Sequence, residues 1–289
     1  MRRRTFLAAV TGAAALAAAR PAIGGGAAEI LKEIGPPRGI CVVLGDRQAA
    51  LAIELARGSE LQLYVPLPAE DVAAALRAAD AAGLYGTRVV IEQQTPGRIA
   101  LADNLADAVV AAGDLGKTPK AEVLRVLRPE GKAFLGGETW SKPFPAGIDD
   151  WSHHYHSPYN NTQSLDQLAR APYLTQYIAD PRYAPAPQAA VASGGRIFMA
   201  FGHVAWHERE EPWLNTLVTL NAFNGAMLWK RPLTPGIMVD RSTMIATPEA
   251  LYLADEKSCK VLDPATGKQI DEIVPPADKA EGTFWKWMA

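Results

Sequence analysis

Apolar and polar positions alternate in blocks along the first half of the chain. The run Gly39–Leu44 is apolar throughout, which is typical of a strand buried on both faces. Helical spacing follows over Gln48–Arg57, and Gly58 ends it. The same rhythm predicts strands at 61–65, 88–91, 107–111 and 132–135 and helices at 68–82 and 118–127. Strands alternating with helices indicate a parallel sheet, so we expect an α/β, Rossmann-like domain over residues 35–140.

The pattern changes in the second half, where short strands alternate with turns rich in Gly, Asn, Asp and Pro. Two turns of one form, Asn221–Gly225 and Asp263–Gly267, stand 42 residues apart (Asn221 to Asp263). A period in the forties with four short strands per copy indicates β-propeller blades. We therefore expect an all-β part, with a connector and propeller opening at 141–190 and an incomplete set of blades at 191–289.

The side chains of these repeats fit that interpretation. Gly225 and Gly267 are expected where the turn requires a positive φ, a conformation that glycine adopts at no steric cost. Trp229 follows the first turn and is expected to fill the space between neighbouring sheets.

The start of the chain predicts export. Arg3–Leu7 matches the R-R-x-F-L pattern of twin-arginine signals. The Ala-rich run that follows ends at Ala19 and is shorter than the roughly 20 apolar residues of a membrane-spanning helix. Small residues near Ala19 and Ala22 would suit cleavage. We expect a signal peptide at 1–25 and a periplasmic or otherwise extracytoplasmic protein; the alternative is the basic start of an amphipathic helix.

Parts of the first half resemble class I S-adenosylmethionine-dependent methyltransferases. Val43–Asp46 stands where that family has its Gly-rich turn, Asp103–Val110 is similar to its fourth strand, and Val123–Lys132 is similar to its L-x-P-G-G turn. The resemblance covers about residues 35–137. It implies S-adenosylmethionine as a cofactor, with Gly45, Asp46 and Glu92 as the candidate contacts.

The chain departs from that family at two positions that bind the cofactor. Only Gly45 remains of the Gly-rich turn, and Val65–Leu67 offers no carboxylate for the ribose hydroxyls. The domain is also shortened, to about five strands. We therefore expect a degenerate domain with a binding or scaffold role and assign no catalytic residue; an active methyltransferase is the alternative.

The two repeats resemble the pyrroloquinoline-quinone-type repeat A-x-D-x-x-T-G-x-x-x-W, and Asp149–Gln167 resembles the segment that opens such quinoprotein propellers. The order of the parts is similar to that of exported bacterial, planctomycete-like proteins with a methyltransferase-like domain ahead of a propeller. A quinoprotein dehydrogenase needs Ca²⁺ ligands and often a disulfide between adjacent cysteines, whereas Cys41 and Cys259 lie in different domains. The repeat thus indicates the fold more than the cofactor, with a pyrroloquinoline-quinone-dependent oxidoreductase as a further alternative.

Histidines offer a second candidate site. His153 and His156 could reach one metal ion, because imidazole suits Zn²⁺ or Cu²⁺; the alternative is a connector that packs its rings at the domain junction. His203 and His207 are four residues apart, as in helical metal sites, but an exposed inserted loop is the competing interpretation.

Composition limits the classes of partner that this chain is expected to bind. The net charge of −2 argues against a nucleic-acid-binding protein, and two cysteines exclude a disulfide-rich scaffold. We expect an unidentified protein or small-molecule ligand and no integral membrane segment beyond the signal peptide. The run Thr283–Ala289 is apolar and strand-like, which predicts either a fragment of a longer protein or self-association through an open propeller edge.

Overall fold

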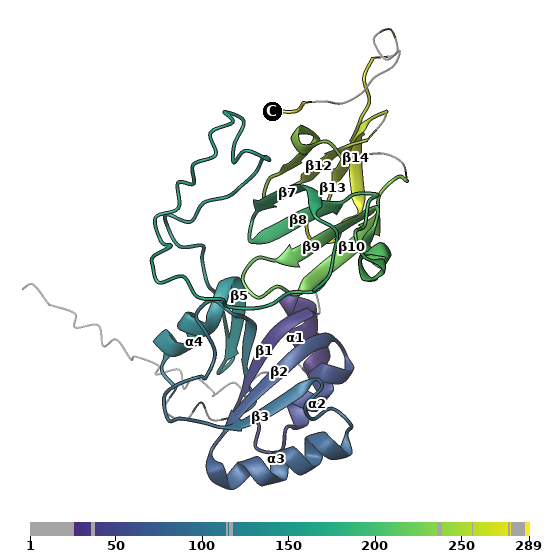
Figure 1. Cartoon of the computed structure of the whole chain (residues 1–289). Coiled ribbons are helices and arrows are strands. Elements are labelled where there is room, and N and C mark those ends of the chain that lie inside the picture. Colours follow the sequence, from purple (N-terminus) through teal and green to yellow (C-terminus); the bar gives the residue numbers. More distant parts are fainter. Residues whose placement is uncertain are drawn as a thin grey trace, which may run out of the picture.

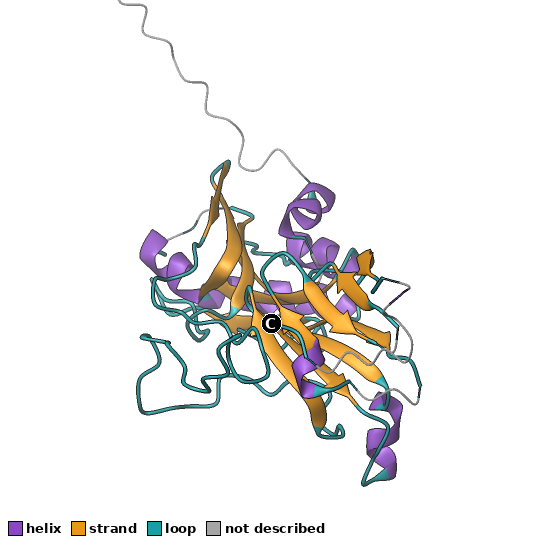
Figure 2. Cartoon of the chain, turned by 90° about the horizontal axis from the view of Figure 1, so that it is seen from above, coloured by secondary structure: helices purple, strands orange, loops and turns teal. Residues whose placement is uncertain are grey.

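The computed structural model describes residues 26–35, 38–113, 115, 118–235, 239–255, 257–276, 278 and 287–289. The predicted signal peptide and most of the apolar run at 283–289 lie outside the described residues. An α/β half and a β half are joined by a long connector, residues 142–186, in which no helix or strand is described (Figures 1 and 2). None of the described helices has the length and apolar character needed to cross a membrane.

The N-terminal half is built on a six-stranded sheet of order β3-β2-β1-β4-β5-β6. Its strands are β1 (Arg38–Leu44), β2 (Glu60–Leu67), β3 (Val89–Gln93), β4 (Ala106–Ala111), β5 (Leu127–Leu135) and β6 (Glu138–Ser141). The first five run parallel, which confirms the α/β prediction. The expected count of about five strands was one short, because Gly136 and Gly137 turn the chain back into β6, antiparallel to β5.

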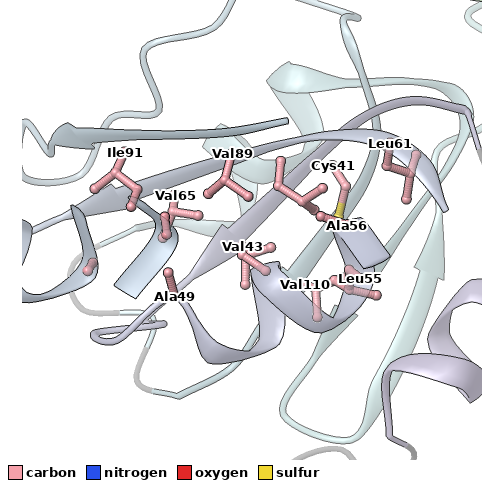
Figure 3. Packing of buried hydrophobic residues seen from close by; sticks show 14 of the residues in the cluster. Cys41, Val43, Ala49, Leu55, Ala56, Leu61, Val65, Val89, Ile91 and Val110 are labelled. Carbon is pink, nitrogen blue, oxygen red and sulfur yellow. The ribbon is translucent and has the colours of Figure 1, made fainter. Parts of the chain in front are cut away.

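Helices and one loop cover the two faces of this sheet. The helices are α1 (Ala27–Ile34), α2 (Ala50–Arg57), α3 (Ala69–Ala81) and α4 (Lys120–Val126). Cys41 and Val43 of β1 face the side covered by α1, α2 and α3, where they join a fully buried cluster (Figure 3). Val42 and Leu44 face the other side, beneath α4 and the loop residue Ile99. Alternate residues of β1 thus enter two cores, as expected for a strand buried on both faces.

The C-terminal half contains two four-stranded antiparallel sheets, each following sequence order. The first holds β7 (Pro187–Ser193), β8 (Arg196–Phe201), β9 (Thr216–Asn221) and β10 (Met227–Pro232). The second holds β11 (Met244–Ala246), β12 (Leu251–Ala254), β13 (Cys259–Leu262) and β14 (Gln269–Ile273). The 3₁₀ helices η1 (Glu208–Trp213) and η2 (Arg241–Thr243) lie in the connections. The described residues thus show two blade-sized sheets, and the propeller itself stays a prediction.

The two turns predicted from the sequence have matching backbone geometry. Gly225 and Gly267 have φ values of 71° and 69°. Trp229 of β10 is buried, its indole N–H donates to the carbonyl of Pro264 at 3.0 Å, and its ring lies against Gly267 of the second sheet. The predicted role of Trp229 between neighbouring sheets is confirmed.

The connector also ties the two sheets together at their first strands. Trp151 pairs with Ala192 of β7 through two backbone hydrogen bonds, each of 2.8 Å. The next residue, Ser152, accepts a hydrogen bond from the N–H of Ala246 in β11 at 3.0 Å. β7 and β11 therefore lie on either side of this short segment.

Candidate functional site

The carboxyl edge of the parallel sheet is where Rossmann-like folds bind cofactors, and Gly45 and Asp46 lie there, directly after β1. Asp46 is 6% exposed, and its carboxylate accepts hydrogen bonds from the N–H groups of Ala50 and Ala52, both at 2.9 Å. Burial raises the pKa of Asp46, and these hydrogen bonds act in the opposite direction. Asp46 thus satisfies the free N–H groups at the start of α2, the groups that would otherwise bind an anionic ligand.

A second loop closes over the same turn. Gly45 has φ of 72°, so its backbone adopts a conformation that favours glycine. A Cβ added to Gly113, which follows β4, would lie 3.1 Å from the carbonyl oxygen of Gly45. The two loops are in close backbone contact, and this contact narrows the space above the end of β1.

Glu92 lies at the same edge but on another strand. It is exposed in β3, opposite Pro66 of β2, and so stands two strands, roughly 10 Å, from β1. The hydroxyl of Tyr64 donates to Glu92 at 3.1 Å. Burial and the bond to Glu92 raise the pKa of Tyr64 to about 12. The structure therefore brings Gly45 and Asp46 together and holds Glu92 in a separate pair with Tyr64; their cofactor contacts stay a prediction.

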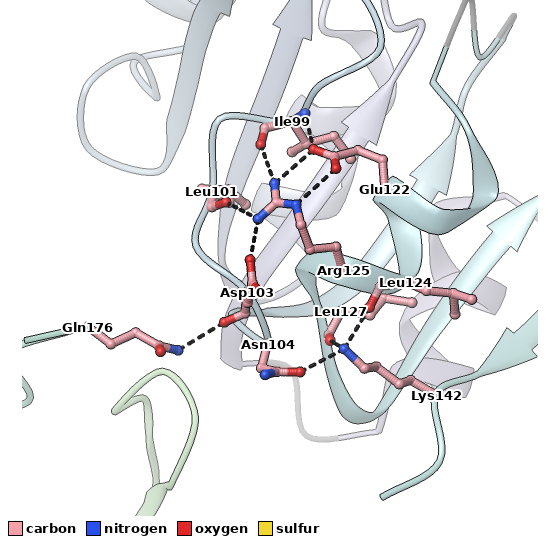
Figure 4. Close-up of polar contacts among 10 residues, drawn as sticks. All are labelled: Ile99, Leu101, Asp103, Asn104, Glu122, Leu124, Arg125, Leu127, Lys142 and Gln176. Carbon is pink, nitrogen blue, oxygen red and sulfur yellow. Dashed lines mark hydrogen bonds and ion pairs between the residues drawn. The ribbon is translucent and has the colours of Figure 1, made fainter. Parts of the chain in front are cut away.

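The connection from β3 to β4 contains no described helix and is held by Arg125 of α4 (Figure 4). The Arg125 guanidinium donates to the carbonyls of Ile99 and Leu101 and pairs with Asp103 and Glu122, at distances of 2.7–2.9 Å. Glu122 also accepts the Ile99 N–H at 2.8 Å. The hydrogen bonds from Arg125, opposed by partial burial, lower the pKa of Glu122 to about 2. This cluster fixes Ile99, which is fully buried, against the sheet.

The connector histidines are engaged in local contacts. His156 is buried, and its two ring nitrogens contact the Asp149 carboxylate at 3.0 Å and the Asn161 carbonyl at 3.1 Å. His153 Nδ1 contacts the Ser152 hydroxyl at 2.8 Å, and burial lowers the pKa of His153. Within the described parts of the chain, no group of three or more His, Cys, Asp or Glu side chains could hold a metal ion. The contacts of His156 favour the packing alternative, and metal binding at His153 and His156 stays a prediction.

The inserted histidines lie in an exposed segment. His203 and His207 are both exposed, and the side chain of His207 accepts a hydrogen bond from the Glu210 N–H at the start of η1. Trp206 beside them is 83% exposed. The exposed loop, the competing interpretation of this pair, is therefore the one observed.

The amino edge of the parallel sheet holds a second buried carboxylate, Asp107, near the start of β4. It is 5% exposed and accepts the Ile40 N–H at 2.8 Å and the Arg128 guanidinium at 2.5 Å. The side-chain amides of Asn221 and Asn224 donate to it at 2.9 and 2.7 Å. Two elements of the α/β half and the turn between β9 and β10 of the β half thus share one carboxylate.

Further contacts extend this junction. Arg38 donates to the Met227 carbonyl at 3.2 Å and pairs with Glu60 at 2.9 Å. The Asn224 amide also reaches the Leu105 carbonyl at 3.0 Å. Beside these contacts lies an open cavity of about 940 Å³ between the two halves, lined in part by Arg38, Trp213 and Lys230. The β half therefore contacts the amino edge of the parallel sheet, which is opposite to the edge where the cofactor site is predicted.

The sequence predicts Asn221 and Asn224 only as turn residues and Asp107 only as a strand residue. One signal was available, because Asp107 is an acidic residue within an otherwise apolar strand, and such a residue requires partners when it is buried. Its two asparagine partners lie 114 and 117 positions away, so their identity could not be obtained from local pattern.

Comparisons with known proteins concern the N-terminal half. No family model matches the chain, and no curated protein matches it. Solved structures that are similar include a proposed S-adenosylmethionine-dependent methyltransferase of Methanococcus maripaludis (27% identity, 37% of this chain and 51% of that chain, TM-score 0.35). Others are an S-adenosylmethionine-dependent methyltransferase of Aquifex aeolicus (20%, 37% and 61%, 0.32) and a proposed sarcosine dimethylglycine methyltransferase of Galdieria sulphuraria (19%, 37% and 43%, 0.34). The chain spans about half the length of these proteins.

Proposed function

We propose that this chain is an exported binding or scaffold protein in which a degenerate methyltransferase-like domain carries a quinoprotein-like β-propeller part. In this proposal the α/β half supports the β half and does not methylate a substrate. The ligand is an unidentified protein or small molecule.

The observation that carries this proposal is the position of Asp46. Rossmann-like sites bind the anionic groups of a cofactor with free backbone N–H groups at the helix that follows the first strand, and in S-adenosylmethionine the anionic group is the carboxylate. Here a buried carboxylate of the chain already accepts the hydrogen bonds of Ala50 and Ala52. The missing second glycine and the absence of a carboxylate at Val65–Leu67 point the same way.

Calorimetric titration with S-adenosylmethionine tests the proposal. We expect no saturable binding by the wild-type chain, that is, a Kd weaker than about 1 mM. Glu92→Gln serves as the matched variant, because Glu92 is exposed and its replacement leaves the cores intact. Micromolar binding by the wild type that weakens about tenfold in Glu92→Gln, a loss of about 1.4 kcal/mol, would overturn the proposal and favour an active methyltransferase.

The methyltransferase alternative rests on the Gly45 turn and on Glu92, which both stand at the carboxyl edge. The oxidoreductase alternative rests on the repeat, whose turns and Trp229 have the expected geometry. Reconstitution with pyrroloquinoline quinone and Ca²⁺, followed by a dye-reduction assay, tests that second alternative. Turnover in this assay would contradict a binding role.

Export is a separate part of the proposal and is supported by the R-R-x-F-L pattern alone. A fusion of residues 1–25 to a reporter that functions only outside the cytoplasm provides the test. We expect the wild-type leader to give a signal and the Arg3→Lys/Arg4→Lys leader to give none. Equal signals from the two leaders would contradict twin-arginine export.

A further inference from the structure

Tyr177 of the connector lies on the turn Asn221–Gly225, which joins β9 to β10. Its hydroxyl donates to the Ala222 carbonyl at 2.8 Å, and its ring lies against Gly225, where a Cβ would overlap it. Burial raises the pKa of Tyr177. The preceding residue, Gln176, donates to the carbonyl of Asp103 at 3.2 Å (Figure 4). It also donates to the carbonyl of Phe223 at 2.9 Å, so this segment touches both halves of the molecule.

The same contacts recur one sheet further on. Trp229 donates to the carbonyl of Pro264, and its ring lies against Gly267. Pro264 follows the first residue of its turn just as Ala222 follows Asn221, and Gly267 occupies the position of Gly225. At each turn, therefore, one aromatic side chain packs against the glycine, and its hydroxyl or indole N–H donates to the carbonyl of the second turn residue. In the second sheet that aromatic residue comes from the neighbouring sheet, and in the first sheet it comes from the connector.

We propose that the turn Asn221–Gly225 is a receiving site for an aromatic side chain that carries a hydrogen-bond donor, and that Gln176–Ala179 fills it in place of the outer strand of a preceding blade. We call Gln176–Ala179 the strap. The strap covers this flank of the first sheet, so that no further blade can pack there. Gln176 of the strap also joins the first sheet to the α/β half. The inference rests on the two turns and their contacts, so it holds whether or not the protein binds a cofactor.

Among the described residues, no aromatic side chain takes the corresponding position on the opposite flank. The residue that corresponds to Trp229 in the second repeat is Asp271, in β14, whose residues are all exposed. An acidic side chain cannot fill an apolar space between sheets without a large desolvation cost. The two flanks of this pair of sheets are therefore different, and only the first is closed by an aromatic residue among the described parts.

Limited trypsin digestion of the full chain tests the strap, because Arg170 and Arg182 are exposed on either side of it. Tyr177→Ala should release the strap and raise the initial rate of cleavage at these two arginines about tenfold, since proteolysis follows local opening. Tyr177→Trp should be cleaved within about twofold of the wild-type rate, because tryptophan fills the equivalent site of the second sheet. Tyr173→Ala is the matched control, since Tyr173 is 79% exposed in the same segment, and it should leave the rate unchanged.

Two results would overturn the proposal. One is an initial cleavage rate of Tyr177→Ala equal to that of the wild type, and the other is cleavage of Tyr177→Trp as fast as that of Tyr177→Ala. If Tyr177→Ala does not fold, Tyr177→Phe replaces it, because it keeps the ring and removes only the donor. Its cleavage should be about threefold faster than that of Tyr177→Trp. Equal rates for these two variants would contradict a site that selects a donor.

Discussion

The two edges of the N-terminal sheet each bury one aspartate, and the two aspartates have different partners. Asp46, at the carboxyl edge, is held by backbone N–H groups four and six residues further along its own chain. Asp107, at the amino edge, is held by Arg128, by a backbone N–H and by two asparagines of the other half. The first aspartate caps a helix, and the second joins two halves of the molecule.

This difference bears on how the fold is used. In Rossmann-like folds the carboxyl edge binds ligands because its backbone N–H groups are free. In this chain those groups are partly satisfied by Asp46, while the amino edge carries the contacts between the halves. The sheet has the parallel strands of a Rossmann-like fold. Asp107, the carboxylate that joins the two halves, lies at the edge opposite to the one where such folds bind ligands.

Asp107→Ala should have the largest effect. It removes the buried carboxylate that accepts hydrogen bonds from the half-buried Arg128, from the buried Asn221 and from the half-buried Asn224. We therefore expect a loss of about 3–5 kcal/mol in the free energy of unfolding, measured by chemical denaturation. If Asp107 joins the halves, calorimetry of this variant should also resolve two transitions where the wild type shows one.

Asp103→Ala is the control for that variant. Asp103 precedes the same strand, but its side chain is 71% exposed and its pair with Arg125 lies at the surface. We expect less than about 1 kcal/mol of destabilisation. Equal losses for Asp103→Ala and Asp107→Ala would remove the distinction between the two edges.

Glu122 provides an intermediate case, since it binds both a nearby guanidinium and a backbone N–H within one half. Its pKa in the folded state is lowered to about 2, below the usual value of a glutamate, so its stabilisation is present above pH about 4.5 and is lost as the pH falls toward 2. We expect this pH-dependent contribution to reach roughly 2 kcal/mol. Denaturation curves at pH 2.5 to 6 should show a weaker pH dependence for Glu122→Gln than for the wild type. Parallel pH dependences would show that Arg125 does not stabilise the charged carboxylate.

Apart from the control Asp103→Ala, Asp46→Ala should have the smallest effect, a loss of about 1 kcal/mol, which is typical of removing a helix cap. Asp46→Asn should lose less, because the amide oxygen still accepts a backbone hydrogen bond. Both variants should unfold in one transition. A loss for Asp46→Ala as large as that for Asp107→Ala would indicate that the carboxyl edge, too, carries contacts beyond its own helix.

The comparison also separates what the sequence could predict from what it could not. The parallel strands, the turns at Gly225 and Gly267 and the role of Trp229 follow from local spacing and turn chemistry, and the structure confirms them. The strand β6 was not predicted, because a four-residue strand carries little periodic signal. Helix α1 was not predicted because it falls at Ala27–Ile34, between the predicted signal peptide and the first predicted strand. The junction at Asp107 and the Tyr177 contact depend on residues more than 40 positions apart, which local patterns do not connect.

Hydrogen exchange of the wild-type chain with and without about 1 mM S-adenosylmethionine tests the central claim, that the carboxyl edge is closed by the chain's own residues and the amino edge joins the halves. We predict slow exchange at Ile40 and in the turn Asn221–Gly225 under both conditions and no change in residues 45–52. Protection of residues 45–52 by the cofactor, together with rapid exchange at the turn, would contradict the claim.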